Sequence, residues 1–260
     1  MILRILENIR GNSNKPAPAD PERQKLCSDG VPDHIYAVGD VHGCEAQFET
    51  VLRKIGADAA GRPGSKWLIM LGDYVDRGPG SAAVVDRLIN RPPAGIRLFC
   101  LAGNHEEVML DFLLNPSKDH QWLSFGGIAT LRSYGIDKLP ADRVEIKNLI
   151  KAHVPPAHIN WLANLPSLFF VPGYSFVHAG VRPGIALAAQ RDSDLLWLRP
   201  SNASRSQIVE KRVTVHGHTP VGAVEIWPAR INIDTGAYMS GLLSAIRISG
   251  GEAPVVIDSR

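Results

Sequence analysis

Charge of one sign and long apolar runs are both scarce in this sequence. Its 260 residues hold 28 Lys and Arg against 26 Asp and Glu, a formal net charge of +2. A nucleic-acid-binding surface would show a strong basic bias. The longest apolar runs, such as Trp67–Leu71, fall far short of the roughly 20 residues that span a bilayer. We therefore expect neither a nucleic-acid partner nor a membrane span.

Cysteine is also scarce, and its pattern limits the kinds of metal site. Cys27, Cys44 and Cys100 are an odd number and show no CxxC spacing. This pattern disfavours a disulfide framework or a thiolate zinc site and fits a reducing compartment best. The sequence also lacks the basic start, apolar core and cleavage site of a secretory signal. We expect a cytoplasmic protein in which histidine and oxygen ligands would hold any metal.

The sequence divides at residue 33. Residues 11–21 are rich in Pro, Asn and Ala, a composition typical of a linker. Apolar residues in 1–9 stand at helical spacing, which leaves open either a short docking helix or a frayed terminus. We expect an N-terminal extension and linker over residues 1–33 and one folded domain over residues 34–260.

A strand–helix rhythm begins at residue 34. Apolar runs at 34–38, 66–71 and 97–102 lead to Gly followed by Asp or Asn, and a helical pattern follows each. This alternation predicts an α/β fold with adjacent parallel strands buried on both faces. Residues 116–166 are expected to be mostly helical. The remainder turns to β, with strands predicted at 168–171, 174–178, 212–216, 230–234, 242–248 and 255–258.

Side chains that could bind metal follow several of these strands. They are Asp40, His42, Asp73, Asn104, His178 and His216. In open α/β sheets, ligands bind beyond the carboxyl ends of the strands. A mixed nitrogen and oxygen set suits Mn²⁺, Fe or Zn²⁺ better than Ca²⁺ or Mg²⁺. Six ligands exceed one tetrahedral zinc site and favour two ions that share a carboxylate.

The alternative is that these residues are structural. A single Gly-Asp after a strand usually forms a turn, and a lone histidine is more often a hydrogen-bonded structural residue than a ligand. The combination of three Gly-Asx strand ends with two strand-end histidines favours the metal site.

Five short blocks stand in order between residues 34 and 245. They are Gly39-Asp-Val-His-Gly43, Gly72-Asp-Tyr-Val-Asp-Arg-Gly78, Gly103-Asn-His-Glu106, His178-Ala-Gly180 and His216-Gly-His-Thr219. They resemble the signature blocks of the PPP-type, calcineurin-like metallophosphoesterases, above all those of bacterial and phage serine/threonine protein phosphatases. The resemblance implies a two-sheet β-sandwich flanked by helices, with residues 34–260 as the metallophosphoesterase catalytic domain.

The resemblance also implies a role for each metal ligand. Asp73 would bridge two divalent ions, expected to be Mn, with Fe or Zn as alternatives. The other ligands would be Asp40 and His42 for the first ion, and Asn104, His178 and His216 for the second. Such ions lower the pKa of bound water. The hydroxide between them would attack phosphorus in line with the leaving oxygen, without a phosphoenzyme.

Proton transfer and phosphate binding are implied in the same way. In the family, the histidine after the asparagine ligand is a general acid oriented by an aspartate of the preceding block, here His105 and Asp76. Arg77 would hold phosphate oxygens, because a guanidinium matches two of them in a fork. A second phosphate-binding arginine is expected downstream of the fourth block, with Arg199 favoured over Arg182.

Two further residues have weaker assignments. Tyr238 either lines the pocket or is simply an aromatic at a strand end, and His218 is expected to hold the loop around His216. The departures from the eukaryotic pattern, such as Leu101-Ala102 before the third block and Ala179 in the fourth, indicate a bacterial-type enzyme.

The favoured function is a metal-dependent phosphomonoesterase, a serine/threonine protein phosphatase acting on phosphoproteins or phosphopeptides and, in vitro, on small phosphate esters. One alternative is a symmetrical diadenosine tetraphosphatase, a relative whose second block typically lacks the counterpart of Asp76. A tyrosine-directed phosphatase with the same dinuclear site is another. A catalytically dead binding module is disfavoured, because every expected ligand is present.

Overall fold

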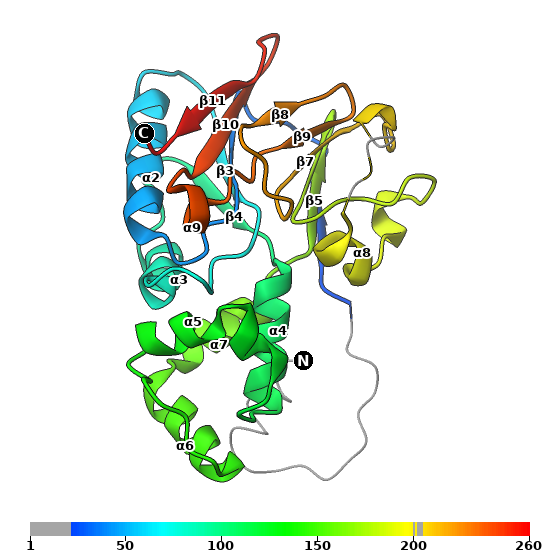
Figure 1. Ribbon diagram of the computed structural model, residues 1–260. Helices are drawn as coiled ribbons and strands as arrows, with labels where there is room; N and C mark the ends of the chain where they lie inside the picture. The colour runs from blue at the N-terminus through cyan, green and yellow to red at the C-terminus, as the bar shows by residue number, and fades with distance from the viewer. Residues whose placement is uncertain (1–21, 200, 202–204) are drawn as a thin grey trace.

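Two β-sheets packed face to face form the centre of the molecule (Figure 1). The computed structural model describes residues 22–199, 201 and 205–260, so the segment 1–9 lies outside the described residues. One sheet has the order β11-β10-β2-β3-β4 and the other β1-β5-β6-β7-β9-β8. The predicted α/β fold with a two-sheet sandwich is confirmed. The strands are β1 Lys25–Cys27, β2 His34–Val38, β3 Lys66–Met70, β4 Arg97–Cys100, β5 Leu168–Val171, β6 Tyr174–Val177, β7 Val213–His216, β8 Glu225–Ile226, β9 Arg230–Asn232, β10 Ser244–Ser249 and β11 Val255–Asp258.

The central strands of the sheet of β2 are buried on both faces. β2, β3 and β4 pair in parallel, and β10 runs antiparallel to β2. Successive side chains of a strand point to opposite faces. Ile35 and Ala37 therefore pack against the other sheet, whereas Tyr36 and Val38 pack against helices. The parallel arrangement brings the carboxyl ends of β2, β3 and β4 to one edge.

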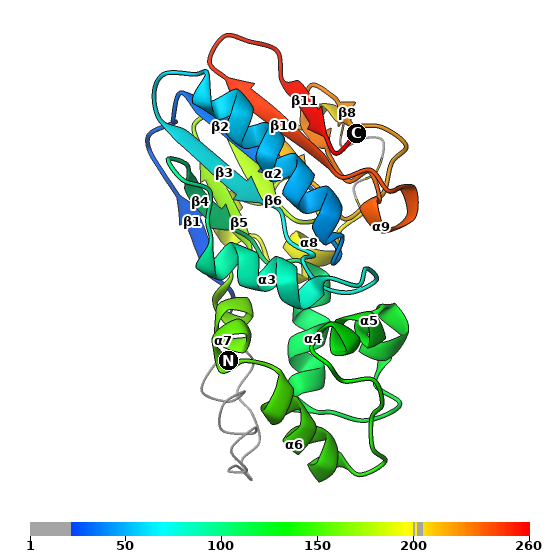
Figure 2. The same cartoon turned by 90° about the vertical axis from the view of Figure 1, so that its left-hand side faces the viewer.

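Helices cover the outer faces. α2 and α3 lie on the sheet of β2, and α4 to α7 form a helical lobe below the sandwich (Figure 2), which includes the predicted helical middle. Within the described residues, no helix is both long and apolar enough to cross a membrane. The helices are α2 Glu45–Ala60, α3 Ser81–Asn90, α4 Asn104–Leu114, η1 Gln121–Phe125, α5 Gly127–Ser133, α6 Arg143–His153, α7 Pro156–Asn164, η2 Leu187–Ala189, α8 Asp192–Trp197 and α9 Ala237–Ser240.

The N-terminal part of the described chain contains a strand that the sequence analysis treats as linker. β1 pairs in parallel with β5, with Lys25 opposite Leu168. Just before it, a guanidinium nitrogen of Arg23 donates hydrogen bonds to the carbonyl oxygens of Leu162 (3.2 Å) and Leu165 (2.9 Å). These contacts fasten residues 23–27 to the domain, although the proposed boundary at residue 33 stays a prediction.

Asp58 of α2 ties that helix to the sheet of β2. Its carboxylate accepts hydrogen bonds from Tyr36 Oη (2.6 Å) and Arg247 Nη1 (2.7 Å), and from Arg62 Nε (3.0 Å). Partial burial alone would favour the neutral carboxyl. The three hydrogen bonds outweigh it and hold the pKa of Asp58 below its ordinary value.

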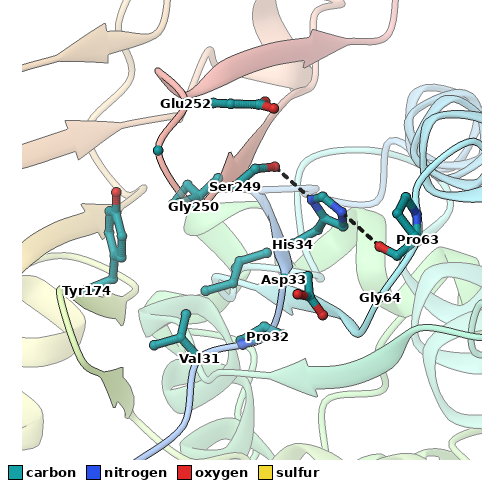
Figure 3. A pocket seen from close by; sticks show the side chains of 13 residues that line it. Val31, Pro32, Asp33, His34, Pro63, Gly64, Tyr174, Ser249, Gly250 and Glu252 are labelled. Carbon is teal, nitrogen blue, oxygen red and sulfur yellow. Dashed lines mark hydrogen bonds between the residues drawn. The ribbon is translucent and has the colours of Figure 1, made fainter.

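A cavity of about 700 Å³ lies at the amino end of β2 (Figure 3). There His34 Nδ1 lies 2.8 Å from Ser249 Oγ, and its Nε2 lies 3.1 Å from the carbonyl oxygen of Pro63. Both ring nitrogens of His34 thus have hydrogen-bond partners, Ser249 and Pro63, at this end of the sheet. The metal-capable clusters found among the described residues do not include it.

Candidate active site

A second cavity, of about 500 Å³, lies at the opposite, carboxyl end of β2 and gathers most of the predicted site residues. It is lined by Asp40, His42, Asp73, Arg77, Asn104, His105, Phe125, Trp197, Arg199, His218, Pro220 and Tyr238. His178, fully buried after β6, joins the cluster from below through Asp73 and Asn104. Segments from residue 40 to residue 238 therefore build one site.

The loops of this site hold unusual backbone conformations. Five residues have φ between 45° and 75°, and they are His42, Asp73, Asp76, Arg77 and His218. L-residues rarely adopt this left-handed region, and such strain concentrates at functional sites. The sheets impose these conformations to aim the side chains into one cavity.

Glu106 fastens two of the loops together. Its buried carboxyl accepts hydrogen bonds from the backbone N–H groups of Asp73, Tyr74 and Gly103, each at 2.8 Å. Burial, followed by the nearby Asp73, raises the pKa of Glu106 to about 7. Glu106 stands three residues after the cap residue Gly103, the position of the acid in a capping box, and this spacing was the signal in the sequence that could have found it.

The imidazoles of His42 and His178 present lone pairs to Asp73. His42 Nδ1 lies 2.9 Å from the carbonyl oxygen of Val75, and His178 Nδ1 lies 3.1 Å from that of Leu71. A carbonyl only accepts, so each Nδ1 carries the proton and each Nε2 a lone pair. Both Nε2 atoms lie 3.4 Å from Asp73 Oδ2. Burial lowers the pKa of His42 to about 3 and also lowers that of His178, so both rings are neutral.

Further acceptors complete two overlapping groups. Asn104 Oδ1 lies 2.9 Å from His178 Nε2 and 2.9 Å from His218 Nδ1. The two groups able to hold a metal are His42 with Asp73 and His105, and Asp73 with His178 and His218. Asp73 belongs to both. Carboxylate, amide and imidazole atoms that converge in this way are a donor set that suits divalent cations.

Asp40 adds a second carboxylate at the cavity. Its Oδ2 accepts the backbone N–H of His218 at 3.0 Å, while Oδ1 is buried and has no hydrogen-bond partner in the part of the chain described. Burial, then the charges of Asp234 and Asp73, raise the pKa of Asp40 well above its ordinary value. An unpaired buried carboxylate oxygen beside two further acids is what a cation would satisfy.

His216, an expected ligand, lies outside this cluster, whereas His218 lies within it. Val215 packs between the two sheets, so the adjacent His216 points to the opposite face of β7. There it lines a separate small cavity with Thr214 and Arg230. The chain leaves the strand after His216, and the left-handed backbone of His218 turns its ring toward Asn104. The ring of His218, which was expected to hold the loop around His216, thus lines the cavity itself.

Gly217, between the two histidines, allows the close approach of Asp40. A methyl group at this position would overlap Asp40 Oδ1 and lie 3.1 Å from its Cγ. Carbon atoms in contact are normally separated by about 3.5–4.0 Å. Only glycine therefore fits without displacing the carboxylate.

His105 and Asp76 form the expected pair. His105 Nδ1 lies 2.6 Å from Asp76 Oδ2, and both side chains are buried. Burial works to lower the pKa of His105, but Asp73 and Asp76 outweigh it and raise the value above the ordinary one. Arg77 Nη2 lies 3.1 Å from His105 Nε2, at the cavity side of the ring.

The predicted phosphate-binding residues separate into two groups. Arg77 and Arg199 line the cavity, as does Tyr238, whose ring lies 4.2 Å beneath the Arg77 guanidinium. Arg182 does not line it. Its guanidinium is exposed and forms a bidentate ion pair with Asp194 of α8.

A family model for calcineurin-like phosphoesterases matches residues 34–240. The chain belongs to this family. It is 28% identical to serine/threonine-protein phosphatase 2 of Escherichia coli K12, covering 83% of this chain and 93% of that protein. It is 24% identical to the asymmetrical bis(5'-nucleosyl)-tetraphosphatase PrpE of Anoxybacillus flavithermus, covering 81% and 88%. A solved cold-active protein tyrosine phosphatase has a TM-score of 0.57 at 18% identity, covering 90% of this chain and 81% of that one.

This calcineurin-like phosphoesterase is thus a hydrolase of phosphate esters. Its site also includes Asp234, to which the sequence analysis assigned no role. Burial raises the pKa of Asp234 to about 6, and its charge acts on Asp40. The available signal was its position after β9, where it follows a strand as Asp40 and Asp73 do.

Proposed function

We propose that this phosphoesterase is a metal-dependent phosphomonoesterase, specifically a serine/threonine protein phosphatase. The observation that carries the proposal is the buried Asp76–His105 pair beside two ligand groups that share Asp73. A serine or threonine alkoxide is a poor leaving group, so its departure gains from a positioned acid. Phosphoproteins or phosphopeptides are the proposed substrates and the cytoplasm the proposed compartment.

The ligand assignment starts from the two groups, adds the oxygen donors Asp40 and Asn104, and keeps His105 as the acid. Asp73 would bridge two ions, with manganese as the proposed metal. We assign Asp40 and His42 to the first ion, and Asn104, His178 and His218 to the second. When bound, such ions supply Lewis acidity that activates a water molecule and polarises the phosphoryl oxygens. Neutral imidazoles and an unpaired carboxylate oxygen support this assignment.

The remaining residues position the ester and move a proton. Arg77 and Arg199 would hold non-bridging phosphate oxygens in charge-assisted hydrogen bonds. Water oxygen adds to phosphorus while the ester P–O bond breaks, giving inorganic phosphate and an alcohol. His105 gives the proton on Nε2 to the departing oxygen, and Asp76 holds Nδ1–H and stabilises the imidazolium.

The alternatives share this site and differ in the leaving group. Dinucleotide tetraphosphatases and a tyrosine phosphatase are among the proteins that resemble this chain. A nucleotide or a phenolate is a weaker base than a serine alkoxide and depends less on an acid. The intact acid pair therefore favours phosphoserine and phosphothreonine.

The test compares substrates on one manganese-loaded preparation. We expect phosphoserine and phosphothreonine peptides to be cleaved faster than phosphotyrosine peptides or diadenosine tetraphosphate, and p-nitrophenyl phosphate to be cleaved until a chelator removes the metal. His105→Ala should lower kcat on phosphoserine by roughly 10²- to 10⁴-fold, and Asp73→Asn should abolish activity. His34→Ala, at the opposite, amino end of β2, is the matched control. Rapid cleavage of the dinucleotide alone would overturn the proposal.

A further inference from the structure

We propose that Trp122 and Thr130 are positioning residues that orient Asp76 and, through it, the His105 acid. The inference rests on the proposed function, because it assumes that His105 protonates the leaving group. Neither residue lies in the signature blocks, and both come from the helical lobe, more than forty positions from Asp76 along the chain.

The Asp76 carboxylate is saturated with donors from this lobe. Trp122 Nε1 donates to both carboxylate oxygens, at 3.0 Å to Oδ1 and 2.9 Å to Oδ2, and Thr130 Oγ1 donates to Oδ1 at 2.7 Å. Asp76, Trp122 and Thr130 are all fully buried. A buried carboxylate without such donors would be strongly disfavoured.

The geometry fixes direction as well as charge. Thr130 and Trp122 hold Oδ1, which leaves Oδ2 aimed at His105 Nδ1 at 2.6 Å. Thr130 Oγ1 also accepts the backbone N–H of Asp76 at 2.7 Å. The Thr130 hydroxyl therefore forms hydrogen bonds with both the main chain and the side chain of Asp76, whose φ is 75°. Because Nδ1–H points to Asp76, Nε2 is the nitrogen turned to the cavity.

The same lobe segment contributes to the cavity itself. Gly126 accepts a hydrogen bond from the backbone N–H of Arg77 at 3.3 Å, and Phe125 lines the cavity near His105. Figure 2 shows α5 beside α4, beneath α3. The segment from η1 to α5 thus holds two loop residues, Asp76, which bonds His105, and Arg77, which lines the cavity. The helical lobe therefore orients the Asp76–His105 pair, in addition to packing against the sandwich.

The experiment separates proton transfer from general damage by using two leaving groups. A phosphoserine peptide needs an acid, whereas p-nitrophenolate leaves without protonation. Trp122→Phe and Thr130→Val are expected to lower kcat on phosphoserine by about 10-fold, part of the acid's contribution, with less than about threefold loss on p-nitrophenyl phosphate. KM should stay unchanged. Thr130→Ser, which keeps the hydroxyl, should restore most of the loss.

Further variants and measurements test whether a loss of activity comes from misfolding. Trp161→Phe is the matched variant, because Trp161 is partly buried, packs against the ring of Tyr74 and has no hydrogen bond to Asp76 among the described residues; it should leave both rates unchanged. Thermal melts and metal content are measured on every variant. If Trp122→Phe does not fold, the Thr130→Val and Thr130→Ser pair still decides.

A double-mutant cycle separates the acid role of His105 from the positioning role of Trp122 and Thr130. In a His105→Ala background, adding Thr130→Val should cost nothing further, because the acid is already absent. If His105→Ala itself slows both substrates equally, the acid assignment of the proposed function fails. If His105→Ala discriminates between them while Trp122→Phe and Thr130→Val do not, this inference alone is overturned.

Discussion

Replacing Gly217 with alanine should damage the site while leaving the fold intact. The new methyl group would overlap Asp40 Oδ1 and lie 3.1 Å from Cγ, whereas carbon atoms need about 3.5–4.0 Å. The carboxylate must therefore move by roughly half an ångström or more. A misplacement of about 1 Å in a catalytic constellation can cost about 10²-fold. We expect Gly217→Ala to lower kcat on p-nitrophenyl phosphate by on the order of 10- to 100-fold.

The assay is a manganese titration of kcat, since displacement of a ligand should also raise the metal concentration that gives half-maximal activity. Gly222→Ala is the control, because a methyl group there meets nothing within 4 Å. Melting temperatures of the two variants should agree within a few degrees. Full activity of Gly217→Ala at low manganese would refute the argument that Asp40 needs its present place.

Three further predictions test single side chains. His218→Ala should lower manganese-dependent kcat by at least about 100-fold, whereas His216→Ala should mainly lower the melting temperature; equal kinetic losses would contradict the ligand assignment. Arg199→Ala should raise KM for p-nitrophenyl phosphate about 10-fold, through loss of a charge-assisted hydrogen bond, and Arg182→Ala should not. Asp58→Asn should lower the free energy of unfolding by about 1–3 kcal/mol at pH 7. Because the folded-state pKa of Asp58 is lowered, this difference should shrink as pH falls below about 4 in urea titrations.

The regular part of the fold could be predicted from the sequence. Continuous apolar runs mark β2, β3 and β4 within a residue or two, because strands of a sheet that is covered on both faces carry few polar positions. Two short strands, β1 and β8, were not predicted from the sequence. β1 is three residues long and only partly buried, so its place depends on pairing with β5, more than 140 positions away.

The site was predictable where its residues directly follow strands. Asp40, Asp73 and Asn104 reach one cavity because parallel strands end at one edge. The block pattern alone could not tell which of His216 and His218 lies at the cavity. Because Val215 packs between the sheets, the adjacent His216 points to the opposite face of β7.

The contacts of Trp122 and Thr130 with Asp76 could not be predicted from the sequence. They reach Asp76 only through packing of the helical lobe against the loop before α3, and no period in the sequence links them.

The site residues with left-handed backbone conformations limit how this protein can be made more stable. Each such conformation costs on the order of 1 kcal/mol or more, so the five positions together approach the roughly 5–15 kcal/mol net stability of a typical domain. Substitutions that relax them would be selected readily in a screen for heat resistance alone. Stability and activity are therefore opposed at these positions, and variants chosen for thermostability should be sought on α2, α6 and the strand surfaces instead.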